Sequence, residues 1–253
     1  MEDLKIYNRI MRLSSLKPSK ETNDAFSDLV KYCEENKAIN LKRYQIDELR
    51  KLSSIAEYEM EIYWATRIIA AKDSREELKK FWYYINYEQL VDLEYINSKN
   101  IYYKDIQSVL FVGGGPLPLT SILLCMKYNM PCTILERDKK SNQISFELIK
   151  KLGLETKITC THVDAEDYSD YSSYDIIYVA ALVGSTSIIK NKIISRIYDN
   201  LTHHSLVLCR SSHGTRRLLY ASISKSLLDT LKPVLEVRPY NSIINSFFIL
   251  QKT

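Results

Sequence analysis

Apolar residues follow two different spacings along this chain, and the spacing changes near residue 105. Before that point they recur every three or four positions, which is typical of helices, as in Leu41, Tyr44, Ile46, Leu49, Leu52 and Ile55. Beyond it, short apolar runs alternate with amphipathic segments. The pattern predicts an N-terminal helical domain over residues 1–105 and an α/β domain over residues 106–253.

Seven short apolar runs in the second part predict strands. They occupy residues 108–112, 132–136, 157–161, 175–179, 205–209, 234–237 and 247–250. Helices are expected at 119–128, between the second strand and residue 152, and at 188–201. Strands that alternate with helices form a mostly parallel sheet covered on both faces. The two strands that end the chain fit an antiparallel pair at the edge of that sheet.

A glycine turn separates the first predicted strand from its helix. A strand that ends in glycines and opens a helix is a nucleotide site on geometric grounds, because the backbone can approach the ligand closely. Leu117 and Pro118 stand where a dinucleotide-binding fingerprint would place its third glycine. The turn therefore favours a nucleoside without a pyrophosphate over NAD. The residues expected to contact the nucleoside are Gly113, Gly114, Gly115 and Pro116.

Acidic residues follow two later strands. Glu136 ends the second strand, where a carboxylate can accept hydrogen bonds from ribose hydroxyls. Asp164 follows the third strand, and Asp164 with Ala165 could meet an adenine edge. Taken singly, Glu136 also fits a surface acid and Asp164 a turn cap. Together with the glycine turn, they resemble the site of class I S-adenosylmethionine-dependent transferases.

Composition and charge argue against several other classes of protein. The formal net charge is +4 over 253 residues and the basic residues are spread out, so nucleic acid is not an expected partner. The five cysteines contain no C-x-x-C pair and favour free thiols in a reducing compartment. The first residues lack a signal-peptide core, and no apolar run has membrane-spanning length. We therefore expect a cytoplasmic protein without a membrane partner.

Five segments of the chain resemble the nicotianamine synthase family. In order, they are residues 81–87 (FWYYINY), 111–120 (FVGGGPLPLT), 179–184 (VAALVG), 210–216 (RSSHGTR) and the pair Asn245-Ser246. The likeness extends over roughly residues 57–252, and the first fifty residues match only as helix. It implies an α/β, Rossmann-like fold of the class I S-adenosylmethionine-dependent transferases with an N-terminal helical domain.

The resemblance implies an unusual use of S-adenosylmethionine, which serves as a substrate. Nicotianamine synthases transfer its α-aminobutyrate arm, not its methyl group, to an amine that attacks the γ carbon beside the sulfonium, and methylthioadenosine leaves. They repeat this step with three donor molecules, whereas related metallophore enzymes perform it once, on an amino acid such as histidine. The substrates are small molecules, and the product chelates metal ions after release. The chemistry requires no metal, and the histidines and cysteines show no ligand spacing.

Two residues before the glycine turn are the expected catalytic residues. The resemblance places the family's catalytic glutamate at Glu61, where a carboxylate could accept the proton of the attacking amine. Tyr87 closes the aromatic run, where its hydroxyl could hold the amine and its ring could lie near the sulfonium. Glu57, Glu59 and Glu61 also fit a solvated acidic helix face, and the tyrosines of this run also fit core packing.

Substrate carboxylates require partners, and the matched segments supply candidates for them. They are Arg210 and Arg216, whose guanidinium groups match carboxylates, His213 as a donor or second proton carrier, Tyr84 and Asn245. The segment 179–184 adds Ala181 to the expected donor site. An arginine at a strand end could equally pair with a structural acid, and a loop histidine could serve neither purpose.

The residues alone leave other functions open. These are a methyltransferase that acts on a small amine or on RNA, a single-transfer synthase that acts on an amino acid, and a non-catalytic protein that senses the donor or a metallophore. Ser185-Thr186-Ser187 follows Gly184 where the family commonly has a bulkier segment, so the number of transfers is not fixed by the sequence. Neither is the oligomeric state, for which a homodimer is one option.

Overall fold

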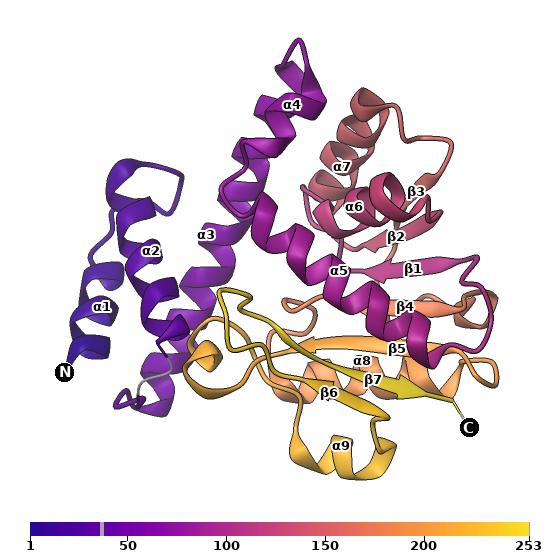
Figure 1. The fold of residues 1–253 in the computed structure, drawn as a ribbon. Helices are drawn as coiled ribbons and strands as arrows, with labels where there is room; N and C mark the ends of the chain where they lie inside the picture. Colours follow the sequence, from indigo (N-terminus) through magenta and orange to yellow (C-terminus); the bar gives the residue numbers. More distant parts are fainter. Residues whose placement is uncertain (36–37, 253) are drawn as a thin grey trace.

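A seven-stranded sheet forms the centre of the structure, a computed structural model that describes residues 1–35 and 38–252. Its strands are β1 (Val109–Val112), β2 (Cys132–Glu136), β3 (Ile158–His162), β4 (Ile176–Val179), β5 (Leu206–Ser211), β6 (Leu235–Val237) and β7 (Ser246–Gln251). They lie in the order β3-β2-β1-β4-β5-β7-β6 (Figure 1). β1 to β5 are parallel, and β7 runs antiparallel between β5 and β6. The predicted parallel sheet with an antiparallel final pair is confirmed, and β6 forms its edge.

Helices both precede and cover the sheet. Within the described residues, those before β1 are α1 (Glu2–Met11), α2 (Lys20–Glu34), α3 (Arg43–Ala70), α4 (Ser74–Lys79) and α5 (Tyr84–Ile101). Those after β1 are α6 (Leu119–Tyr128), α7 (Lys139–Leu152), α8 (Ser187–Asp199), α9 (Lys225–Leu231) and the short 3-10 helices η1 (Tyr171–Ser173) and η2 (Gly214–Leu218). The three helices predicted between strands are confirmed to within two residues. α9, η1 and η2 are additional.

The strand order creates a crevice at one end of the sheet. From β1 the chain moves outward to β2 and β3, and it then returns to β4 on the other side of β1. The connections after β1 and β4 therefore leave in opposite directions, and ligands of open parallel sheets bind at such a switch point. The glycine turn after β1 thus lies where the topology itself provides a site.

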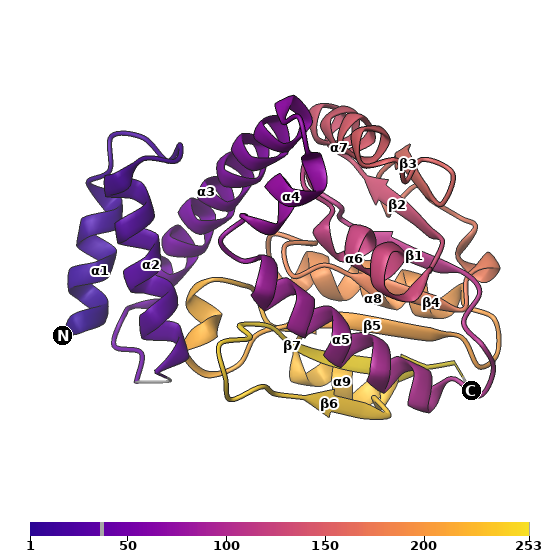
Figure 2. The same ribbon diagram turned by 45° about the horizontal axis from the view of Figure 1, so that its top comes forward.

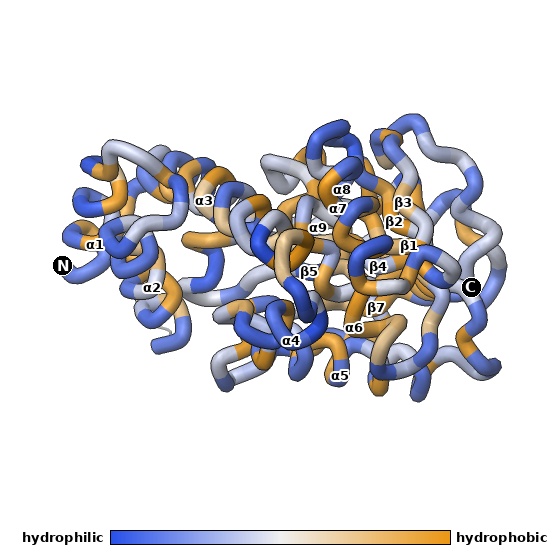
Figure 3. Tube along the Cα trace, turned by 90° about the horizontal axis from the view of Figure 1, so that it is seen from above, coloured by the Kyte–Doolittle hydropathy of each residue, from blue (hydrophilic) through white to orange (hydrophobic). Residues whose placement is uncertain are grey.

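Side chains of each strand alternate between two layers of helices, because successive residues point to opposite faces of the sheet. Leu110 and Val112 pack with Ile193 of α8, whereas Phe111 packs in the other layer with residues such as Leu123 of α6. Figures 1 and 2 show α5, α6 and α7 on one face and α8 and α9 on the other. In Figure 3 the hydrophobic stretches are concentrated in the strands, and the outer loops are mostly hydrophilic.

Helix α3 joins the helical part of the chain to the sheet. Its 28 residues correspond to about 42 Å at 1.5 Å per residue. Leu49, near its start, packs in a core with α1 and α2, whereas Trp64 and Ile68, near its end, belong to the main core beside the sheet. Figure 2 shows α3 running from the α1–α2 pair towards α7. The middle of α3 is therefore held between two anchored ends.

A buried ion pair fixes α5 and α6 against the sheet. Arg210 in β5 donates from Nε and Nη2 to the two carboxylate oxygens of Glu94 in α5, each at 2.8 Å. Nη2 also donates to Oγ1 of Thr120 in α6 at 2.8 Å. Arg210 is 4% exposed and Glu94 is 0% exposed. Each buried charge therefore depends on the other for its compensation.

No helix in the described part of the chain combines the length and the apolar character that crossing a membrane requires.

We expect Glu94→Gln to lower the free energy of unfolding by about 3–5 kcal/mol, because it leaves the guanidinium of Arg210 buried without its counter-ion. Asp28→Asn is the matched control, since it breaks the exposed Arg9–Asp28 pair and exposed pairs contribute about 0–1 kcal/mol. Urea denaturation measures both losses. Equal losses in the two variants would contradict the role of the buried pair.

Candidate active site

The turn after β1 requires glycine because of its backbone angles and its close contacts. Gly113 and Gly115 have φ angles of +85° and +63°, in the left-handed region that glycine adopts without strain. A Cβ atom on Gly113 would lie 2.5 Å from Cγ2 of Val183, and one on Gly115 would lie 2.6 Å from Oε2 of Glu61. The turn is therefore packed between the segment after β4 and the carboxylate of α3.

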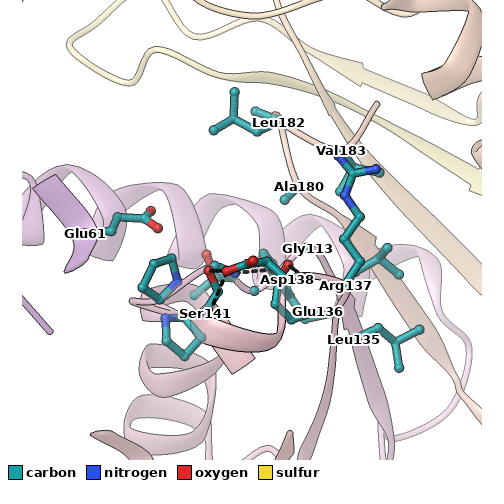
Figure 4. A pocket seen from close by; sticks show the side chains of 18 of the residues that line it. Glu61, Gly113, Leu135, Glu136, Arg137, Asp138, Ser141, Ala180, Leu182 and Val183 are labelled. Atoms are coloured by element: carbon teal, nitrogen blue, oxygen red, sulfur yellow. Dashed lines mark hydrogen bonds between the residues drawn. The ribbon is translucent and has the colours of Figure 1, made fainter. Parts of the chain in front are cut away.

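This turn lines a cavity of about 300 Å³ at the carboxyl ends of β1, β2 and β4. In Figure 4, Glu61 points from its helix towards the turn, and Glu136 approaches the turn from β2. The structure brings most of the predicted site residues together on this cavity: Glu61, Tyr87, Gly113, Gly114, Gly115, Pro116, Glu136, Asp164, Ala165, Ala181, Arg210 and Asn245.

Glu136 holds the turn and lines the cavity at the same time. Its Oε2 accepts a hydrogen bond from the backbone N–H of Gly115, and its Oε1 accepts one from that of Asp138, each at 2.8 Å. Each carboxylate oxygen has two lone pairs, so both oxygens can accept a further donor. The hydroxyls of a ribose are donors of this kind.

Asp164 also combines a structural contact with a place on the cavity wall. Its Oδ1 accepts a hydrogen bond from the backbone N–H of Glu166 at 2.9 Å, which is the turn-capping contact that the sequence left open. The guanidinium of Arg137 lies 3.9 Å from its other oxygen. Asp164 and the buried Ala165 therefore form a fixed wall at the end of β3.

A second cavity, of about 110 Å³, is lined by residues of α2, α3 and the segment that opens α5. Its walls include the aromatic side chains of Phe26, Phe81, Trp82 and Tyr83. Five residues line both cavities, and we call this set the junction: Glu57, Glu61, Tyr87, Tyr220 and Asn245. The two cavities therefore meet at the predicted catalytic residues.

The carboxyl groups of the junction hold protons more tightly than ordinary carboxyl groups. Burial raises the pKa of Glu57 to about 7, against the lowering effects of the Tyr220 hydroxyl and the Arg210 guanidinium. Burial also raises the pKa of Glu61 well above its usual value, and the charges of Glu57 and Glu136 raise it further. Neighbouring carboxyl groups titrate as a pair. Glu57 and Glu61 therefore lose their protons at higher pH than ordinary carboxyl groups do.

Arg210 reaches the first cavity, but it is not free to clamp a substrate carboxylate. Its guanidinium donates hydrogen bonds to Glu94 and Thr120. Of the two roles considered for a strand-end arginine, the structure therefore shows pairing with a structural acid. The guanidinium carbon lies 5.9 Å from the centre of the Tyr87 ring. Arg210 acts on the junction through its fixed charge, which lowers the pKa of Glu57.

Three predicted substrate contacts, Tyr84, His213 and Arg216, lie outside both cavities. Tyr84 packs in the main core at the start of α5. Arg216 is buried in η2, with Nη1 3.0 Å from Nε2 of His213 and Nη2 donating to the carbonyl oxygen of Asn241 at 2.9 Å. Burial and the charge of Arg216 lower the pKa of His213. In the structure these side chains take part in packing and loop contacts, and their binding of substrate stays a prediction.

Two residues of the junction are absent from the sequence-based prediction of the site. In the sequence, Glu57 fits a solvated acidic helix face, although its spacing of four from Glu61 puts both on the same side of α3. Tyr220 follows η2, and its hydroxyl donates to Oε2 of Glu57 at 3.0 Å. The helical spacing was an available signal for Glu57, whereas no local pattern marks Tyr220.

Lys190 is a third residue that the sequence did not single out. It is fully buried, and its Nζ donates to the carbonyl oxygens of Ala181 at 2.5 Å and Arg210 at 3.3 Å. Burial lowers the pKa of this amine to about 8. Lys190 ties the segment after β4 to the end of β5 and so holds the wall that carries Ala181.

Asn245 contributes an unsatisfied donor to the junction. Its Nδ2 is buried and has no hydrogen-bond partner among the described residues. A buried polar group left without a partner costs roughly 1–3 kcal/mol. A ligand that accepts a hydrogen bond from Asn245 would remove that cost.

Within residues 1–35 and 38–252, the His, Cys, Asp and Glu side chains form no group of three or more suited to a metal ion.

The strand order and the glycine turn define the fold of the class I S-adenosylmethionine-dependent transferases. The S-adenosylmethionine-dependent methyltransferase SibL is similar with a TM-score of 0.54 over 91% of this chain and 75% of that chain, at 14% identity. MtNAS in complex with MTA and tNA gives a TM-score of 0.87 over 99% and 97% of the two chains, at 19% identity. A mutant of MtNAS in complex with S-adenosylmethionine gives 0.85 over 99% and 96%, at 20% identity.

Sequence comparisons identify the family. The family model for nicotianamine synthase protein matches residues 2–253. Nicotianamine synthase 3 of Arabidopsis thaliana is 30% identical over 98% of this chain and 81% of its own length. Nicotianamine synthase of Solanum lycopersicum is 29% identical over the same shares. The chain belongs to the nicotianamine synthase family, which confirms the resemblance seen in the sequence.

We expect the stability of the protein to depend on pH through Glu57. A carboxyl group with a raised pKa stabilises the fold below its unfolded pKa of 4.5, and that contribution is lost as the pH rises through the folded value of about 7. Glu57→Gln removes this loss. The variant should therefore melt higher than the wild type at pH 8, by roughly 2–4 °C per kcal/mol, but not near pH 4.5.

Thermal unfolding followed by circular dichroism measures this effect at the two pH values. Glu59→Gln is the control, because it makes the same charge change on α3 at a residue that lines neither cavity. The same pH-dependent gain in the control would show that the effect does not come from the junction.

We expect Gly115→Ala to impair turnover more than stability. Its new methyl group would meet Oε2 of Glu61 and push that flexible carboxylate away from the turn. Gly153→Ala is the matched control, since Gly153 also has a positive φ, +69°, but open space around it. Both variants should lose about 1–2 kcal/mol of stability.

Only Gly115→Ala should lower the turnover of S-adenosylmethionine, by about tenfold or more, because small displacements of reacting groups have large effects on rate. Urea denaturation and initial rates measure the two quantities. An equal loss of turnover in both variants would mean that backbone strain, and not the position of Glu61, is responsible.

Proposed function

We propose that this protein transfers the α-aminobutyrate arm of S-adenosylmethionine to an amine acceptor, releases methylthioadenosine and so builds a nicotianamine-type metallophore. The observation that carries the proposal is the junction, where the cavity at the glycine turn meets the second cavity. A donor in the first cavity and an acceptor in the second would bring their reacting atoms together there. The relatives named nicotianamine synthase support this reading of the two cavities.

The residues of the first cavity fit the donor. Gly113 and Gly115 allow a nucleoside to approach the backbone closely. Glu136 would accept hydrogen bonds from the ribose hydroxyls, and Asp164 would lie at the adenine edge. The complex of the MtNAS mutant with S-adenosylmethionine supports this assignment.

Each transfer forms one bond and breaks another. The acceptor nitrogen bonds to the γ carbon of the donor, the bond from that carbon to sulfur breaks, and its electron pair stays on sulfur as neutral methylthioadenosine leaves. The nitrogen needs a free lone pair, yet an α-amine is mostly protonated below a pKa of roughly 8. One proton must therefore pass from the amine to a base in each transfer.

Glu61 and Tyr87 are placed for that step. The carboxylate of Glu61 lies over Gly115 on the donor side and also lines the second cavity. Burial raises the pKa of Glu61, so its ionised form is a stronger base than a carboxylate in water. Burial raises the pKa of Tyr87 as well. Tyr87 therefore keeps its hydroxyl proton and can hold the amine in line.

Asn245 is the substrate-binding residue that the geometry favours. Its Nδ2 lacks a partner and stands at the junction, where the carboxylate of a donor or acceptor could accept its hydrogen bond. Arg210 contributes charge but no free hydrogen-bonding face for a carboxylate, because Glu94 occupies it.

Compartment, partners and domains follow from the same proposal. A cytoplasmic location is supported by the five cysteines, which are all free thiols. The partners would be small-molecule substrates, not nucleic acid or a membrane, and the released product would chelate metal ions.

We propose residues 1–105 and 106–253 as the two domains, with α3 contributing to a core on each side. A homodimer stays an option.

A single transfer onto an amino acid is a second candidate. The second cavity, at about 110 Å³, is much smaller than the first, which favours a small acceptor over a growing chain. Histidine is an acceptor of suitable size. The number of transfers is therefore a quantity that the experiment below measures.

We expect incubation of the protein with S-adenosylmethionine, alone and with histidine, to release methylthioadenosine. Glu61→Gln should lower this release by about 10²-fold or more, as expected for loss of a general base, while calorimetry shows donor binding within a few-fold of the wild type. Mass spectrometry of the products counts the transfers. S-adenosylhomocysteine with a methylated acceptor would establish a methyltransferase instead, and binding without turnover would establish a sensor.

A further inference from the structure

Glu57 is a second carboxyl group at the point where donor and acceptor would meet. It lies one helical turn before Glu61 on the same side of α3, and both side chains line both cavities. Glu59 lies between them in sequence but lines neither cavity. The position of Glu57 is therefore specific to the junction and is not a general property of this acidic segment.

A hydrogen bond holds Glu57 in the junction. The hydroxyl of Tyr220 donates to its Oε2 at 3.0 Å, and this contact joins α3 to the segment after η2. Tyr220 itself lines both cavities. A carboxylate that accepts a hydrogen bond is stabilised in its ionised form. Tyr220 therefore favours the state of Glu57 that can receive a proton.

The charged and titratable groups around Glu57 come from several elements. Tyr220 and Arg210 lower its pKa, and burial raises it to about 7. Burial raises the pKa of Glu61, the second carboxyl group, and the charges of Glu57 and Glu136 raise it further. Both carboxyl groups therefore hold a proton more tightly than carboxyl groups in water do.

The raised pKa values matter for the proposed reaction, because a carboxyl group that already carries a proton cannot accept another. Each transfer delivers one proton from the acceptor amine to the junction, as the nitrogen–carbon bond forms and the carbon–sulfur bond breaks. A single carboxyl group with a strongly raised pKa would accept that proton only after losing its own. A second carboxylate on the same helix face, within the same pair of cavities, removes this obstacle.

Resting on the proposed function, we propose that Glu57 is a second proton-accepting residue of the transfer reaction, which acts as a unit with Glu61 and is positioned by Tyr220. The amine proton passes to the pair, and the pair returns it to water after the products leave. Glu57 also presents a negative charge to the ammonium form of an incoming acceptor. Tyr220 is a positioning residue, since it acts through Glu57.

The test compares Glu57→Gln, Tyr220→Phe, Glu61→Gln and the double variant Glu57→Gln/Glu61→Gln with Glu59→Gln as the matched control. Release of methylthioadenosine from saturating S-adenosylmethionine, alone and with histidine, is followed from pH 5.5 to pH 9. Calorimetry with S-adenosylmethionine reports donor binding. We expect Glu57→Gln to lower kcat by about 10²-fold with donor binding within about threefold of the wild type, and Glu59→Gln to match the wild type.

Two further results separate a proton-carrying role from a merely structural one. The double variant should be about as active as the less active of the two single variants. The reason is that the effects of substituting residues that act as a unit do not add. Tyr220→Phe should move the acid limb of the kcat/KM profile to higher pH, because it removes the hydrogen bond that lowers the pKa of Glu57. Tyr220→Phe also keeps the inference testable if Glu57→Gln does not fold.

The outcomes distinguish this inference from the proposed function. A wild-type protein that releases no methylthioadenosine would overturn both. Release by the wild type together with wild-type kcat in Glu57→Gln would overturn the role of Glu57 alone. An unshifted acid limb in Tyr220→Phe would overturn the positioning role, and multiplied losses in the double variant would overturn the paired action.

Discussion

The close approach of α3 to the turn after β1 is the contact on which the whole site depends. Oε2 of Glu61 occupies the space that a side chain at Gly115 would need. The approach is possible because the turn is glycine, and it persists because α3 is anchored in one core by Leu49 and in another by Trp64. The glycine turn therefore does more than admit a nucleoside to the backbone. It also admits a carboxylate from a distant part of the chain.

Two kinds of buried charge surround this contact, and they have different consequences. Arg210 and Glu94 are buried with each other's hydrogen bonds, and Lys190 is buried on two carbonyl oxygens, so these charges hold the frame. Glu57 and Glu61 are partly buried in the cavity walls without a directly bonded cation in the described residues, and their raised pKa values reflect the loss of solvation. Perturbed groups of the second kind are typical of functional sites. The rigid frame is what allows the fold to keep them.

Those features of the fold and the site that depend on local sequence pattern or on strand order can be predicted from the sequence. Val109–Val112 is an unbroken apolar run because every residue of β1 is buried, and Glu136 reaches the cavity because β2 ends there. Arg210 shows where this reasoning stops. Its strand-end position predicts its place on the cavity, but Glu94, 116 positions earlier, decides that its guanidinium is engaged. Contacts over such separations have no local signature.

Tyr220 is the extreme case of the same limit. It meets Glu57 across 163 positions, from a segment without regular secondary structure, so neither residue type nor spacing marks it. Glu57 is intermediate, since helical spacing relates it to Glu61 but cannot tell a cavity-lining face from a solvated one. The tertiary packing of α3 decides whether this helix face lines a cavity or faces solvent, and that packing is known only from the structure.

The charge of the donor completes the electrostatics of the junction. In the proposed reaction, S-adenosylmethionine brings a sulfonium cation beside Glu57 and Glu61, and a positive charge within about 4–6 Å favours the ionised form of a carboxyl group. Donor binding would therefore lower the pKa of both carboxyl groups and favour their proton-accepting forms. Neutral methylthioadenosine provides no such charge, so the pair would hold the amine proton until the products leave. The junction would then be the strongest proton acceptor while the electrophile is bound. No conformational change is needed for this, because it follows from the charge of the donor beside two partly buried carboxyl groups on one helix.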